Sequence, residues 1–169
     1  MIPKIENILY TTGLGSGTPY VFRYALSLAQ KYDAKIHIIH GHEPLPASAQ
    51  GMADLYMVQE KSEDIFEKAV IETEIKIKER LELLCAKETA SDPQGRERIA
   101  SITVAKLPAK QAILQEAEKR NIDLIVMGSH RHSVLSDAML GTTTLKVLHK
   151  STIPVMVVRI PEGYSEAGF

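Results

Sequence analysis

The chain has 169 residues, of which 44% are apolar and 24% are charged. This length and composition indicate one folded domain of ordinary size and exclude an intrinsically disordered chain. With 20 Lys and Arg residues against 21 Asp and Glu residues, the net charge is -1, which provides no long-range field for holding nucleic acid or an anionic membrane.

The chain begins with a predicted strand, a glycine-rich turn and a helix. Residues 5–11 (IENILYT) have the apolar character of a short strand, and residues 13–17 form the turn that follows it. Thr18 is a candidate helix cap, because Pro19 beside it is favoured at the first position of a helix.

A second strand and a long helix come next. Residues 34–40 (AKIHIIH) have the pattern of a strand that ends at Gly41. Residues 62–87 place apolar side chains at helical spacing between Phe66 and Leu84, which predicts one buried stripe along a helix. The polar segment 91–98 (SDPQGRER) is interpreted as a turn.

Strands and helices then alternate to the end of the chain. The predicted strands are 99–105, 123–128 and 154–159, and the predicted helices are 108–120 and 142–150. This alternation predicts an α/β fold: a single-domain, doubly wound, five-stranded parallel sheet with helices on both faces. Ligands bind such sheets at the carboxyl ends of the strands, here the loops 12–17, 41–53 and 128–141.

The loop after the fourth strand has features of a phosphate-binding loop. Gly128 ends an apolar run, and Gly141, Thr142 and Thr143 lead into the last helix. Backbone N–H groups at a helix start bind phosphate, and glycine lets the backbone approach closely. A turn at Gly141 with Thr142 as an ordinary helix cap explains the same residues, and spacing alone favours this simpler interpretation.

The whole chain resembles the universal stress protein family. The resemblance covers nearly all of residues 5–159 and is strongest in 7–44 (NILYTTGLGSGTPYVFRYALSLAQKYDAKIHIIHGHEP) and 123–159 (DLIVMGSHRHSVLSDAMLGTTTLKVLHKSTIPVMVVR). It implies the strand order 3-2-1-4-5, a universal stress protein domain over residues 1–161 and a flexible tail over 162–169. It also implies a regulatory binding module of the stress response.

Two positions depart from the pattern of the ATP-binding family members. Those members carry a glycine, two residues, a glycine, nine residues, a glycine and then Ser or Thr. Gly128, Gly141 and Thr142 fit this spacing, but Arg131 occupies the second glycine position, where it would either obstruct phosphate or bind it. The family also holds ribose with an Asp whose position here is Gly13.

The resemblance therefore implies that ATP binding is weak or absent. The alternative is an ATP-binding, slowly hydrolysing nucleotide switch of the same fold. No cofactor is assigned, and an adenine nucleotide is the candidate ligand. The residues expected at its site are Thr12, Gly13, Gly41, Met127, Gly128, His130, Arg131, Gly141, Thr142 and Thr143.

Other chemistry finds little support in the sequence. The chain has no Ser-His-Asp pattern, no Walker lysine motif and no CxxC, and Asp137 is interpreted as a turn or cap residue, so we expect no enzyme. By the resemblance, the histidine pairs 40, 42 and 130, 132 lie about 10 Å apart, so we expect histidines at the surface or behind the residues that contact a ligand, and no metal site. The lone Cys85 is expected to be buried in the core.

Location and partners follow from similar reasoning. The amino end lacks the apolar region of a signal peptide, and no apolar run reaches the roughly 20 residues of a membrane helix. We therefore expect a cytoplasmic protein that binds neither membrane nor nucleic acid. By the resemblance, residues 153–159 form an edge strand that pairs with its twin in a homodimer, and a further protein partner is unknown.

Overall fold

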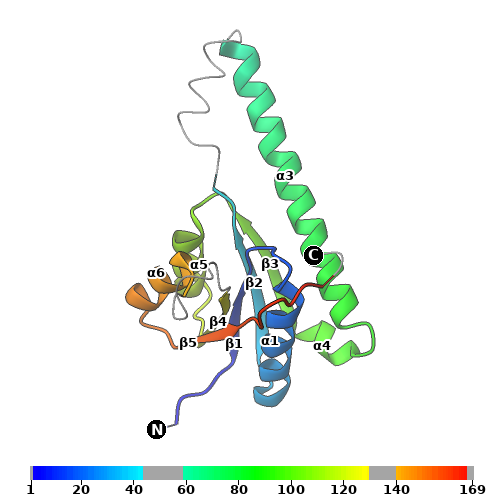
Figure 1. The fold of residues 1–169 in the computed structure, drawn as a ribbon, viewed down its shortest axis with the longest axis vertical. Coiled ribbons are helices and arrows are strands. Elements are labelled where there is room, and N and C mark those ends of the chain that lie inside the picture. Colours follow the sequence, from blue (N-terminus) through cyan, green and yellow to red (C-terminus); the bar gives the residue numbers. More distant parts are fainter. Residues whose placement is uncertain (1, 44–58, 130–139, 167–169) are drawn as a thin grey trace.

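The fold is a five-stranded parallel sheet with helices on both faces (Figure 1). The computed structural model describes residues 2–43, 59–129 and 140–166, and for residues 59–66 it describes the backbone only. The sheet has the order β3-β2-β1-β4-β5, which confirms the predicted fold class and strand order. The strands are β1 (Asn7–Thr11), β2 (Lys35–Gly41), β3 (Ile99–Ala105), β4 (Leu124–Ser129) and β5 (Val155–Arg159).

The helices form two layers that enclose the sheet. One layer contains α1 (Thr18–Tyr32), α3 (Gln59–Glu88) and α4 (Pro93–Arg98), and the other contains α5 (Ala109–Lys119) and α6 (Thr142–Lys150) (Figure 1). Alternate strand residues serve the two layers: Ile8 and Tyr10 pack toward α1, whereas Leu9 packs toward α5. Both faces of the central strands are therefore buried. Among the described helices, none combines the length and apolar character needed to cross a bilayer.

The start of α1 differs from the sequence prediction. Gly17, not Thr18, is the N-cap residue, and Pro19 stands in the first turn. The Thr18 hydroxyl lies 3.2 Å from that of Thr12, and the Thr18 carbonyl accepts a hydrogen bond from the Tyr10 hydroxyl at 2.9 Å. Thr18 therefore ties α1 to β1 and does not cap its own helix.

The segment predicted as a polar turn contains a short helix, α4. Asp92 caps it, because its side chain accepts a hydrogen bond from the Gly95 backbone N–H at 2.9 Å, and Pro93 occupies the first turn. The sequence contained this helix-capping pattern, Asp92 followed by Pro93, but the charged composition of the segment favoured a turn.

The long helix α3 buries only the end of its predicted stripe. Leu81 and Leu84 are fully buried, whereas Ile77 is only half-buried. Figure 1 shows that the first part of α3 extends beyond the sheet, and Val70 and Thr73 of the predicted stripe are likewise only half-buried. The apolar stripe is longer than the surface against which α3 packs. The periodicity therefore predicted a longer buried segment than the structure has.

The chain continues past β5 along the outside of α1. Tyr164 stacks on Tyr20 with ring centroids 5.0 Å apart, and Glu166 forms ion pairs with Arg23 at 3.0 Å and Lys87 at 3.3 Å. These contacts hold residues 164–166 against α1 and α3. Flexibility of the tail 162–169 stays a prediction.

Candidate functional site

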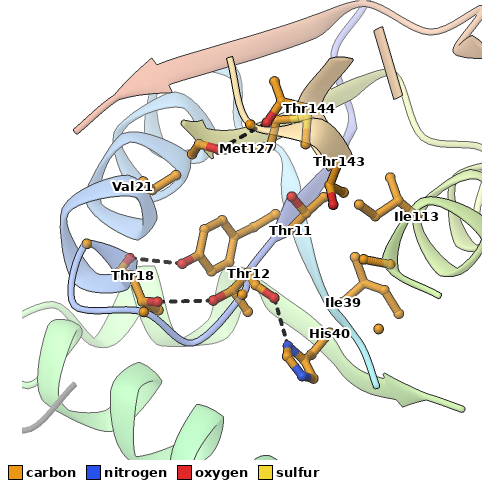
Figure 2. Close-up of a pocket in the computed structure, with 18 of the residues that line it drawn as sticks. Thr11, Thr12, Thr18, Val21, Ile39, His40, Ile113, Met127, Thr143 and Thr144 are labelled. Carbon is orange, nitrogen blue, oxygen red and sulfur yellow. Dashed lines mark hydrogen bonds between the residues drawn. The ribbon is translucent and has the colours of Figure 1, made fainter. Parts of the chain in front are cut away.

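A pocket of about 580 Å³ lies at the carboxyl ends of β1, β2 and β4 (Figure 2). The turn after β1 and the starts of α1, α5 and α6 complete its wall. This is the position expected for a ligand of a doubly wound sheet. The lining residues are Tyr10, Thr11, Thr12, Gly13, Gly15, Ser16, Gly17, Thr18, Val21, Ile39, His40, Gly41, Ala109, Ile113, Met127, Gly128, Gly141, Thr142, Thr143, Thr144 and Ile160.

The pocket brings together eight of the ten residues selected from the sequence. These are Thr12, Gly13, Gly41, Met127, Gly128, Gly141, Thr142 and Thr143. The other two, His130 and Arg131, lie outside the described residues, as does Asp137. The sheet thus gathers positions more than 100 residues apart in the chain, and their role in binding stays a prediction.

Thr12 shapes the turn between β1 and α1. Its hydroxyl accepts a hydrogen bond from the backbone N–H of Leu14 at 3.0 Å. Leu14 has φ of 59°, a left-handed conformation that costs a non-glycine residue about 1–2 kcal/mol. The Thr12 bond offsets part of that cost. The turn lines the pocket, and its Gly13 has no atom within 4 Å of the place where a Cβ would stand.

Two glycines of the pocket are required by close packing. A Cβ on Gly41 would lie 2.6 Å from the Cα of Ala109, because the end of β2 lies against the first residue of α5. A Cβ on Gly128 would lie 2.8 Å from Val21 Cγ2. Gly141 differs, because a Cβ added there would have Thr144 Oγ1, at 3.9 Å, as its nearest atom. Gly41 and Gly128 therefore bring the surrounding elements together, while Gly141 leaves its surroundings open.

Three helices begin at the pocket. Residues 17–18 of α1, 109 of α5 and 141–144 of α6 line it. Among the described residues, none of these helices has a side-chain cap hydrogen bond, and none has an acidic residue in its first turn. Helix starts carry unpaired N–H groups and the positive end of the helix dipole. No Asp, Glu, Lys or Arg occurs among the described lining residues, so the backbone makes the pocket favourable for an anion.

Part of the lining is apolar. Ile39, Ile113 and Met127 belong to the core cluster between the sheet and α5 and α6, and each also reaches the pocket. Figure 2 shows Ile39 and Ile113 facing the labelled threonines across the pocket. An apolar wall beside backbone donors suits a ligand with a ring at one end and a phosphate at the other.

His40 is a pocket residue that the sequence interpretation did not select. Its Nδ1 lies 2.8 Å from the carbonyl oxygen of Thr12 (Figure 2). Burial lowers the pKa of the ring, the Thr12 carbonyl partly opposes this, and the charges of His42 and Arg80 lower it further. The ring is therefore neutral at ordinary pH. Its position at the carboxyl end of β2, directly before Gly41, was the available signal, and the structure shows it half-buried in the pocket lining.

Two other titratable groups, Cys85 and His37, have structural roles. Cys85 is fully buried, as predicted, and burial raises the pKa of its thiol to about 11. His37 is buried and its Nδ1 lies 2.8 Å from the Ser101 hydroxyl. Within the part of the chain that the structure describes, no three His, Cys, Asp or Glu side chains are grouped to hold a metal ion.

Comparisons with known proteins point to one family. A family model described as the universal stress protein family matches residues 4–159. Universal stress protein YxiE of Bacillus subtilis is 30% identical over 136 residues, which cover 80% of this chain and 86% of that protein. A 51-residue stretch, 30% of this chain, is 43% identical to universal stress protein Slr1230 of Synechocystis and covers 18% of it.

Solved structures show the same fold. Universal stress protein UspA from Lactobacillus plantarum has a TM-score of 0.62 at 17% identity, with 94% of this chain and 100% of that chain covered. A universal stress protein in complex with cAMP has a TM-score of 0.52 at 16% identity, with coverage of 93% and 98%. At such identities the likeness concerns the fold alone.

Proposed function

Because the chain belongs to the universal stress protein family, we propose that it is a regulatory binding module of the stress response whose pocket takes a phosphate-bearing ligand and binds ATP weakly. The observation that carries this proposal is the composition of the pocket. Three helix starts supply donors for an anion, yet no carboxylate is available among the described lining residues to hold the rest of a nucleotide.

The part of the pocket at the start of α6 is the better suited of the two ends to bind a phosphate group. The first turn of α6 carries Thr142 and Thr143, and the open surroundings of Gly141 leave its backbone accessible. The Thr144 hydroxyl donates to the Gly128 carbonyl at 3.4 Å, which ties the start of α6 to the end of β4. Such a fixed helix start binds phosphate through backbone N–H groups and the helix dipole.

The sugar end is the weaker part. The resemblance places a ribose-holding Asp at the position of Gly13, which has no side chain to offer. Hydrogen bonds to a charged group contribute about 1.5–3 kcal/mol, so the missing carboxylate should weaken ATP binding by about ten- to a hundredfold. One structural relative is a complex with cAMP, which supports an adenine nucleotide as the ligand class to test first.

We further propose that the protein is a homodimer through β5. This strand is at the edge of the sheet, and Ile160 N–H bonds the Ser129 carbonyl while Ile125 N–H bonds the Pro154 carbonyl. In a parallel ladder this pattern turns the N–H groups of Val155, Val157 and Arg159 away from β4. An edge of this kind favours pairing with a second copy.

Calorimetric titration of the dialysed protein with ATP tests the proposal. We expect a dissociation constant in the millimolar range, and chemical shift changes at the amides of Thr142 and Thr143 when the same titration is followed by NMR. Tight ATP binding would contradict it. ATP turnover that is lost in Asp137→Ala would instead favour the alternative, a slowly hydrolysing nucleotide switch.

A further inference from the structure

His40 is chemically unlike the rest of the pocket. Among the described lining residues it has the only nitrogen-containing side chain, and the only side chain that changes charge near neutral pH. Tyr10, the other titratable lining residue, is fully buried, and its hydroxyl donates to the Thr18 carbonyl. The remaining side chains are apolar or carry hydroxyl groups.

The bond to Thr12 determines which nitrogen of His40 carries the proton. A carbonyl oxygen only accepts hydrogen bonds, so Nδ1 must be the N–H donor across the 2.8 Å contact with Thr12. In the neutral ring Nε2 then has a free lone pair and acts as an acceptor. Within the described residues, Nε2 makes no hydrogen bond of its own.

The distance from α6 determines which part of a ligand His40 meets. His40 is on β2, whereas the start of α6 follows β4, and β1 lies between these strands. Two strand spacings are about 10 Å. A ligand whose phosphate lies at the start of α6 would therefore bring its nucleoside part, not its phosphate, to His40.

We infer that His40 is a specificity-determining residue, whose Nε2 accepts a hydrogen bond from a hydroxyl or amino group on the nucleoside part of the ligand. This inference rests on the proposed function, because it assigns the second end of the same pocket. The neutral acceptor is placed beside Gly13, where the chain provides no carboxylate.

The inference implies a dependence on pH. Protonation turns Nε2 into a donor, which no longer pairs with an amino group, whereas a hydroxyl can reverse its role and accept the hydrogen bond. The charged groups acting on the ring are His42, which follows β2, and Arg80 of α3, and both oppose protonation. A preference for the amino group should therefore hold at neutral pH and disappear on acidification, whereas a preference for a sugar hydroxyl should persist.

A matched variant separates this role from a structural one. His40→Asn places an amide N–H where it can still bond the Thr12 carbonyl, but it has no group at the position of Nε2. The probes are ATP, 2′,3′-dideoxy-ATP, which lacks the sugar hydroxyls, and inosine triphosphate, which lacks the amino group. Affinities come from NMR titrations of the full chain, and the ring nitrogens of His40 are observed in the same samples.

We expect Nδ1 to be protonated and one of the two analogues to bind the wild type about two- to tenfold more weakly than ATP, the value of one hydrogen bond. That difference should vanish in His40→Asn. A proton on Nε2, or an equal difference in both proteins, overturns the inference. If ATP shifts the Thr142 and Thr143 amides but not the ring nitrogens, the inference fails and the proposed function stands. If neither group shifts, both fail.

Discussion

Replacing Gly13 with Asp should convert the weak nucleotide site into a stronger one. The structure allows the change, because an added Cβ at Gly13 meets no atom within 4 Å and the backbone φ there is not in the left-handed region. The residue lines the pocket, in the turn that leads to the start of α1. A negative charge near a helix start is favourable, so the substitution should not destabilise the fold.

The expected gain follows from the bonds that the carboxylate would form. A ribose hydroxyl can donate to it, and one hydrogen bond to a charged acceptor contributes about 1.5–3 kcal/mol. The affinity for ATP should therefore rise by about ten- to a hundredfold. Gly13→Asn is the matched control, because it has the same shape without the charge and should gain about tenfold at most.

Titration calorimetry with ATP and 2′,3′-dideoxy-ATP measures both variants and the wild type. The gain in Gly13→Asp should appear with ATP and be absent with the dideoxy analogue. An equal gain with both nucleotides, or no gain in a variant that unfolds like the wild type, would refute the reasoning. Arg131→Gly extends the series: an additive gain in the double variant identifies Arg131 as an obstruction, whereas a loss identifies it as a phosphate ligand.

Three further outcomes are expected. Val157→Pro removes an N–H that faces away from β4, so it should leave the fold intact and shift the dimer to monomer by light scattering; an unchanged mass contradicts the β5 interface. Burial lowers the pKa of His37 and His40, so on acidification the unfolded chain binds protons before the folded one does. As the pH is lowered from about 7.5 to about 5.5, the free energy of unfolding measured by urea titration should fall, and it should fall less in His40→Asn. Glu166→Gln weakens the ion pair with Arg23 and should lower that free energy by about 0.2–1 kcal/mol; a larger loss would mean that the tail supports the core.

The local pattern of the sequence determined the order and type of nearly all the elements. The alternation of strands and helices, the apolar runs at 124–127 and 154–158, and the glycine-rich turn at 13–17 all correspond to elements in the structure. Local periodicity indicates which side of an element is buried. The parallel α/β arrangement follows from the alternation of strands and helices. The spacing of Gly128 and Gly141 likewise indicated a binding loop, and both residues line the pocket.

The tertiary structure alone decided what each of these residues does. Gly41 and Gly128 are glycines because Ala109 and Val21 pack against them, while Gly13 has open space, and the local sequence does not give this difference in packing. The sequence places His40 at the end of a strand, but only the structure shows that it lines the pocket and that its Nδ1 bonds Thr12. The physical reason is that a pocket is built from the ends of elements far apart in the chain, so its distances, tautomers and free space depend on contacts that no local pattern encodes.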